Sequence, residues 1–141
     1  MDFTAIWSEI MWEDIFKLLL AGVLALLIGF DREKRKKAAG IRTNMIVAII
    51  SCLIMIVSRE IAASELGVLN DADPARLAAQ VISGIGFLGA GTIIKQEDKV
   101  EGLTTAASLW GVAGLGLAIG YGMYIVAIAA ALIIFVGLLF G

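Results

Sequence analysis

The sequence of 141 residues has few of the side chains that soluble enzymes use for chemistry. It contains no histidine, so the commonest zinc ligand and the commonest proton shuttle are missing. Its one cysteine, Cys52, lies in an apolar run and has no second cysteine in the chain for a disulfide. Its one proline, Pro74, follows Asp73, a pair that predicts the start of a helix. Because no nucleophile–base pair stands out, we expect no enzyme.

Charge is also scarce. Charged residues make up 17% of the chain and the net charge is −2, so we expect no nucleic-acid partner. Hydrophobic residues make up 60%, and the mean hydropathy is +0.96; soluble proteins average about 45–50% apolar residues. The apolar runs approach the ~20 residues that crossing ~30 Å of hydrocarbon requires. The composition therefore predicts an all-α integral membrane protein, embedded in the lipid bilayer.

The apolar runs predict five transmembrane helices in one domain, residues 15–141, with spans at about 15–30, 42–58, 74–94, 103–119 and 121–140. Residues 1–14 carry apolar side chains at helical spacing, with Trp7 and Trp12 among them. This pattern predicts a short amphipathic helix on the membrane surface. Gly120-Tyr121-Gly122 predicts a tight turn, so the last two spans should be antiparallel neighbours.

The basic residues predict the orientation. With five spans, the loops at 31–42 and 95–101 lie on one side, and they hold eight of the eleven Lys and Arg residues. The positive-inside rule places these loops in the cytoplasm. The N-terminus is then outside and the C-terminus is cytoplasmic. Lys17, near the other side, should extend to the interface.

A glycine-rich stretch lies in the third span. Gly84, Gly86 and Gly89 have the spacing of a dinucleotide-binding loop, but no strand–helix–strand pattern surrounds them. Small residues also let membrane helices approach closely. We therefore expect helix packing, with spans 74–94 and 103–119 at the buried centre of the bundle or of a homo-oligomer. The packing residues would be Gly84, Gly86, Gly89, Gly91, Gly111, Gly114 and Gly116. The alternative is a partly unwound helix that offers backbone groups to a ligand.

Polar residues near the ends of the spans are the candidate functional residues, because ionisable groups at membrane depth are costly. They are Asp31, Arg32, Glu33, Arg42, Thr43, Asn44, Arg76, Gln80, Thr104, Thr105 and Ser108. Asp31 and Arg42 flank a short loop, which predicts an ion pair. No cofactor is indicated. Mg²⁺ would need carboxylates, and the third to fifth spans contain none from Leu77 to Ile94 or from Leu103 to Phe140, which leaves Asp31 and Glu33 as the best metal candidates.

Three strings carry a family resemblance: GIRTN at 40–44, ARLAAQVISGIGFLGAGTII at 75–94 and VEGLTTAASLWGVAGLGLAIGYGMY at 100–124. They resemble the membrane domain of the MgtC/SapB family. The resemblance places family motifs on residues 31–33, on Ala39, Gly40, Arg42 and Thr43, and on Arg76 and Gln80. Many members have histidine where this chain has Asn44.

The resemblance implies a bacterial or archaeal inner-membrane protein tied to magnesium limitation, which acts mainly as a regulator of, or partner for, other membrane proteins. The alternative is a magnesium or other ion transporter with a polar pathway through the bundle, lined by Asp31, Arg42, Arg76 and Gln80. A third hypothesis is an interaction subunit whose charged loop, residues 31–37, binds an acidic protein surface or anionic lipid. Longer members carry a soluble C-terminal domain; we expect none in this chain, which ends at Gly141.

Overall fold

The computed structural model describes the backbone of residues 3–141 and the side chains of residue 4 and residues 8–141. Its helices are α1 (Phe3–Lys34), α2 (Ile41–Ala63), α3 (Glu65–Leu69), α4 (Arg76–Ala90), α5 (Leu103–Tyr121) and α6 (Tyr124–Leu139). A small antiparallel hairpin joins α4 to α5 and is formed by β1 (Ile94–Gln96) and β2 (Lys99–Glu101). The predicted all-helical fold class is confirmed; the hairpin was not predicted.

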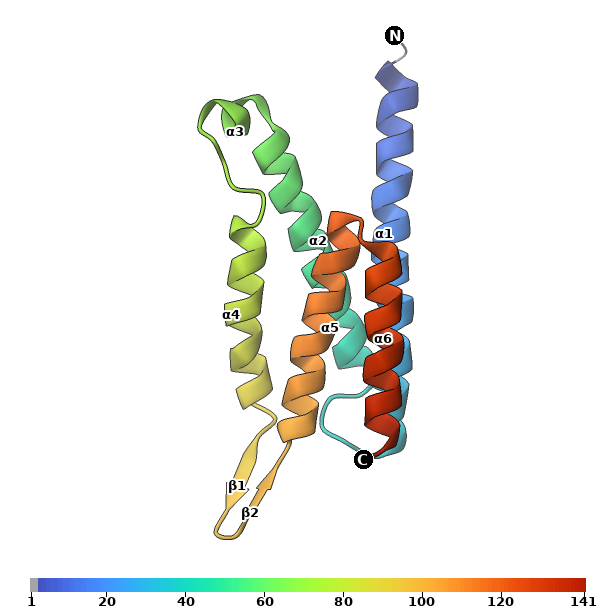
Figure 1. The fold of residues 1–141 in the computed structure, drawn as a ribbon, viewed down its shortest axis with the longest axis vertical. Coiled ribbons are helices and arrows are strands. Elements are labelled where there is room, and N and C mark those ends of the chain that lie inside the picture. Colours follow the sequence, from blue (N-terminus) through green and yellow to red (C-terminus); the bar gives the residue numbers. More distant parts are fainter. Residues whose placement is uncertain (1–2) are drawn as a thin grey trace.

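The five long helices alternate in direction along the bundle (Figure 1). The N-terminus and α3 lie at one end. The loop between α1 and α2, the β-hairpin and the C-terminus lie at the other, which we call the hairpin end (Figure 1). Among residues 3–141, α2 and α5 are long and apolar enough to cross a membrane, and α4 and α6 are shorter apolar helices.

The expected boundary between an N-terminal surface helix and the first span is absent, because α1 runs unbroken from Phe3 to Lys34. No proline or glycine precedes Gly22, and the Lys17 ammonium lies 3.5 Å from carboxylate oxygens of both Glu13 and Asp14. Pairs three and four residues apart stabilise a helix. Lys17 is 2% exposed, so it packs into the bundle instead of extending to the interface. The apolar face expected for 1–14 includes Trp7, whose side chain lies outside the described residues.

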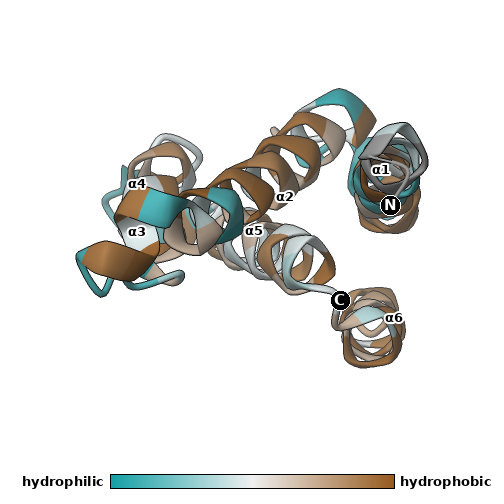
Figure 2. Cartoon of the chain, turned by 90° about the horizontal axis from the view of Figure 1, so that it is seen from above, coloured by the Kyte–Doolittle hydropathy of each residue, from teal (hydrophilic) through white to brown (hydrophobic). Residues whose placement is uncertain are grey.

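The centre of the bundle agrees with the expectation in part. Helix α5, the predicted fourth span, lies in the middle, but its neighbour there is α2, with α1 and α6 on one side and α4, the predicted third span, on the other (Figure 2). A central place for α4 in a homo-oligomer stays a prediction. A Cβ at Gly116 would clash with the carbonyl oxygen of Ala48, and one at Gly120 would lie 2.6 Å from that of Cys52. These two glycines therefore allow α5 to approach the α2 backbone closely. In contrast, α4 buries only Ala78, Ile85 and Gly89.

Helix α4 is shorter than the predicted third span, but it is not unwound. Helix α4 continues through Gly84, Gly86 and Gly89 and ends at Ala90. Its 15 residues span about 22 Å, less than the ~30 Å of a hydrocarbon core. At its start, the Asp73 carboxylate accepts a hydrogen bond from the Ala75 amide at 2.9 Å, so the helix begins close to the predicted position. The expected loop 59–73 instead holds the end of α2 and the short α3.

Candidate functional site at the hairpin end

The last turns of α1 carry a buried charge pair. Asp31 is 6% exposed and Arg32 is 4% exposed. Arg32 Nη2 donates a hydrogen bond to Thr105 Oγ1 on α5 at 3.0 Å. Ser108, also buried, donates from its Oγ to the Thr105 carbonyl oxygen of the same helix at 2.9 Å. The contact links α1 to the start of the central helix.

We expected Asp31 to pair with Arg42. It pairs instead with two arginines of its own segment. Its Oδ1 lies 3.2 Å from Arg35 Nε, and its Oδ2 lies 4.0 Å from Arg32 Nη1. Because α1 continues to Lys34, Arg35 follows Asp31 by one helical turn and reaches it directly. Arg42 is the second residue of α2 and its side chain is exposed. Glu33 and Thr43 are exposed too.

Asn44 holds the loop between α1 and α2 in place. Its Nδ2 donates to the carbonyl oxygens of Ala39 at 3.1 Å and Gly40 at 2.8 Å, and the residue is fully buried. The loop lies tightly against α1, because a Cβ at Gly29 would lie 2.6 Å from the Cα of Ile41. Asn44 therefore fixes the backbone beside the Asp31–Arg32 pair.

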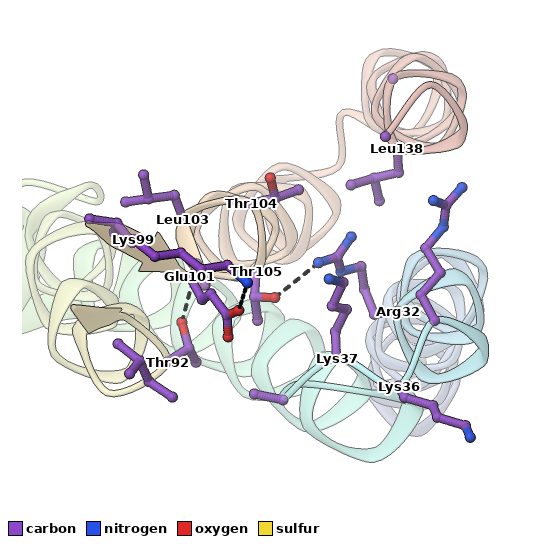
Figure 3. Close-up of a pocket in the computed structure, with 17 residues that line it drawn as sticks. Arg32, Lys36, Lys37, Thr92, Lys99, Glu101, Leu103, Thr104, Thr105 and Leu138 are labelled. Atoms are coloured by element: carbon purple, nitrogen blue, oxygen red, sulfur yellow. Dashed lines mark hydrogen bonds and ion pairs between the residues drawn. The ribbon is translucent and has the colours of Figure 1, made fainter. Parts of the chain in front are cut away.

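A cavity of about 710 Å³ opens beside this pair at the hairpin end. Its lining includes five basic residues and one acidic residue: Arg32, Arg35, Lys36, Lys37, Lys99 and Glu101. The Glu101 carboxylate lies 2.6 Å from the Lys99 ammonium. Their hydrogen bond lowers the pKa of Glu101 and raises the pKa of Lys99. The one acidic side chain of the lining is thus neutralised by its own neighbour (Figure 3).

The N-terminus of α5 faces the same cavity. Gly102, Leu103, Thr104 and Thr105 all line it. Gly102 precedes the helix with φ of 92°, and no side chain caps the helix. The first amides of a helix have no carbonyl partner within it and carry a partial positive charge. The cavity is therefore electropositive from both its side chains and its backbone.

Comparison with known proteins shows the family of this chain. Residues 18–141 match the model of the MgtC family. The chain belongs to the MgtC family. The resemblance seen in the sequence is thus confirmed, and family membership together with the two apolar helices makes this a membrane protein. No solved structure matches the chain.

Named relatives cover most of this MgtC-family chain. The protein SapB of Bacillus subtilis is 43% identical over 130 residues, which are 89% of this chain and 55% of SapB. The protein called putative magnesium transporter YhiD of Escherichia coli K12 is 44% identical over 113 residues, 79% of this chain and 53% of YhiD. The protein MgtC of Salmonella typhimurium LT2 is 42% identical over 125 residues, 89% of this chain and 51% of MgtC. The chain thus spans about half the length of these relatives.

The candidate residues of α4 lie apart from the cavity. Arg76 and Gln80 are exposed on the first turns of α4, away from the hairpin end. Gln80 and Gly84 border a second, apolar groove of about 500 Å³ between α2 and α4. Thr104 is exposed, whereas Thr105 and Ser108 are buried. The polar residues thus form two separate groups.

The candidate packing glycines have different surroundings. Gly116 lies against α2, a Cβ at Gly89 would lie 3.4 Å from Ala106 Cβ, and one at Gly111 would lie 3.3 Å from Ile134 Cδ1. A Cβ at Gly91 would meet only its own helix end, 3.2 Å from the Leu88 carbonyl oxygen. Among the described residues, nothing lies within 4 Å of a Cβ placed at Gly84, Gly86 or Gly114. These last three therefore make no close contact within one copy of the chain.

Of the cavity lining, only Arg32, Thr104 and Thr105 were among the candidate site residues; the missed polar positions include Thr92, Lys99 and Glu101 around the hairpin. Thr92 Oγ1 donates to the carbonyl oxygens of Gly89 at 2.7 Å and Gly102 at 3.3 Å, and so joins the end of α4 to the start of α5. The sequence signal that could have indicated this part of the site is the short polar segment, residues 95–101, between the third and fourth predicted spans. Its turn is Glu97-Asp98, without the asparagine or glycine that usually indicates a two-residue hairpin turn.

Proposed function

We propose that this chain is a five-span inner-membrane protein linked to magnesium homeostasis, and that it acts as a regulator of, or partner for, another membrane protein. The family, and the name putative magnesium transporter that the Escherichia coli relative carries, support the link to magnesium. The alternating direction of α1, α2, α4, α5 and α6 supports five crossings. Eight of the eleven basic residues lie at the hairpin end, which supports a cytoplasmic hairpin end and C-terminus and an external N-terminus.

The charge of the cavity is the observation that carries this proposal. A pathway for a divalent cation needs carboxylate oxygens. The lining of the cavity instead includes five basic residues, and its one acidic side chain is paired with Lys99. Asp31, the best metal candidate, is held by Arg35 and Arg32. An electropositive cavity repels Mg²⁺ and attracts an acidic surface. This favours interaction with a partner over conduction of the cation.

The second candidate function is ion transport. It is favoured by the burial of Asp31 and Arg32 in a helix bundle, because buried ionisable groups often mark ion pathways in membranes. In that case Asp31 would change partners during transport, and loss of its charge would abolish flux.

Ion flux distinguishes the two functions. The full chain is reconstituted into liposomes, and Mg²⁺ uptake is compared with that of protein-free liposomes. The Asp31→Asn variant tests the buried carboxylate, and Glu97→Gln, at an exposed acid in the hairpin turn outside the cavity lining, is the matched control. Growth in low magnesium is measured for the same variants in a strain that lacks the gene. Regulation predicts complementation of growth without flux. Flux that Asp31→Asn loses and Glu97→Gln retains would overturn regulation in favour of transport.

We also propose that the protein forms a homo-oligomer through α4. Arg76, Gln80 and Ser83 are exposed on this helix, and Gly84 and Gly86 leave open space beside it. Polar side chains in a bilayer favour helix contacts, and small residues permit them. Native mass spectrometry should show a smaller oligomer for Gly84→Leu and no change for Ala129→Leu, which adds the same type of bulk to the exposed face of α6. An unchanged oligomer in Gly84→Leu would place the interface elsewhere.

A further inference from the structure

We propose that the cavity at the hairpin end is a binding site for a phosphate group, carried either by a soluble phosphate or by the headgroup of an anionic lipid. The inference rests on the proposed function in one respect: it takes the hairpin end to lie at the cytoplasmic surface of the membrane, where both sources are present.

The cavity keeps positive charge that its own acids do not fully neutralise. Among the described residues no ion pair involves Lys37, and Arg32, although its Nη1 lies 4.0 Å from Asp31, keeps a donor without a partner. In the view of Figure 3 the Arg32 and Lys37 side chains both extend toward the middle of the lining, whereas Lys36 points away from it. Arg35 pairs with Asp31 at 3.2 Å, and Lys99 pairs with Glu101. A bound anion would compensate the charge of Arg32 and Lys37.

Arg32 has an unused donor. The side chain of Arg32 is only 4% exposed. Its Nε is buried and has no hydrogen-bond partner among the described residues. Its Nη2 already donates to Thr105 Oγ1, and its Nη1 is 4.0 Å from the nearest Asp31 oxygen. A buried donor without a partner is destabilising, because it has lost its hydrogen bonds to water. An oxyanion in the cavity would supply an acceptor, and a guanidinium is well shaped to bind phosphate oxygens.

The uncapped N-terminus of α5 adds a second, independent set of donors. The helix has 19 residues. Its N-cap residue, Gly102, has no side chain that could accept hydrogen bonds from the first amides of the helix. Leu103, Thr104 and Thr105 carry these first amides and line the cavity. Helix N-termini of this kind bind phosphate groups through their amides and their partial positive charge.

The chemistry and the size select a phosphate ester over a simple carboxylate. The guanidinium of Arg32, the ammonium of Lys37 and the amides of α5 come from three separate segments, and a tetrahedral phosphate has enough oxygens to meet all three. The volume of about 710 Å³ lies in the range of small-molecule sites, about 300–1,000 Å³. It therefore has room for an organic group attached to the phosphate.

Binding of inorganic phosphate to the purified full chain tests the site. The protein is placed in nanodiscs of phosphatidylcholine, and affinity is measured by isothermal titration calorimetry. Lys37→Gln removes one of the two central cations, and Lys34→Gln makes the same change at an exposed lysine outside the lining. We expect Lys37→Gln to weaken phosphate binding by about tenfold, since a charge-assisted hydrogen bond contributes more than 1.4 kcal/mol. Lys34→Gln should bind as the unmodified chain does.

A second set of nanodiscs, which contains phosphatidylglycerol, identifies the source of the phosphate group. If the lipid headgroup fills the site, the apparent affinity for inorganic phosphate falls in these discs, and Lys37→Gln abolishes the difference. If the ligand is soluble, the affinity is the same in both kinds of disc.

The proposal is overturned if inorganic phosphate shows no saturable binding and phosphatidylglycerol is not enriched around the protein, or if Lys37→Gln and Lys34→Gln behave alike. None of these measurements depends on growth or on flux. If the chain binds phosphate but does not restore growth in low magnesium, the regulatory function is rejected and the phosphate site is kept. If the chain restores growth but does not bind phosphate, the phosphate site is rejected and the regulatory function is kept.

Discussion

The hydrogen bond between Arg32 and Thr105 gives a sharp prediction for the Thr105→Val variant. The change removes the hydroxyl that accepts from Arg32 Nη2 at 3.0 Å and keeps nearly the same side-chain shape. Thr105 is 2% exposed, so water does not readily replace the lost acceptor. Hydrogen bonds to charged groups contribute about 1.5–3 kcal/mol. We therefore expect the free energy of unfolding to fall by about 2 kcal/mol, measured by reversible unfolding in mixed detergent micelles.

The next residue provides the control for this prediction. Thr104 is exposed, so Thr104→Val should change the free energy of unfolding by less than about 0.5 kcal/mol. In an Arg32→Met background, Thr105→Val should have little further effect, because the donor is already gone. The reasoning is refuted if Thr105→Val is as mild as Thr104→Val, or if its effect is the same with and without Arg32.

Three further predictions concern the backbone and the core. Gly116→Ala should lower the free energy of unfolding by about 1–3 kcal/mol in the same assay, because its Cβ would clash with the Ala48 carbonyl oxygen. Gly84→Ala, with open space around it, should be neutral or stabilising by up to ~1 kcal/mol. Equal effects of the two changes would contradict the packing of α5 on α2. Gly102→Ala should destabilise the hairpin by at least about 1–2 kcal/mol, because its φ is 92° and its Cβ would meet the Thr92 backbone. Hydrogen exchange of the hairpin amides should then become faster. An unchanged exchange rate would contradict this strain. Cys52, fully buried, should react with a maleimide only after unfolding in detergent, and rapid labelling of the folded protein would contradict its burial between the central helices.

Much of the helical pattern could be predicted from the sequence because apolar runs and polar breaks are strong signals. Residues 42–58 and 103–119 fall within the observed α2 and α5. The N-terminal boundary was wrong because apolar spacing cannot tell a separate surface helix from one continuous helix. The ion pair of Glu13 with Lys17, four residues apart, was the signal for continuity.

The candidate site was predicted in its residue types but not in its partners. Arg32 and Thr105 were both among the candidates, yet their contact joins residues 73 apart in the chain, and no periodicity reports such a distance. Asp31 was expected beside Arg42, because a short loop brings helix ends together. The extension of α1 to Lys34 instead placed Arg35 one turn away. The side chain that faces a partner depends on the rotation of each helix, which the loop length does not determine.

The position of α5 in the bundle has a consequence for how the protein is made. This helix packs against α1, α2, α4 and α6, so the chain that leaves the ribosome first has only one of its two central helices, α2. The α1–α2 pair can assemble early, since these two helices already contact each other. Helix α4, short and with Arg76 and Gln80 on its surface, can then contact α2, but its larger contact, with α5, forms only after residues 103–121 are synthesised. We expect α4 and α5 to enter the membrane together as a hairpin, and we expect the insertion machinery to shield α4 during that interval.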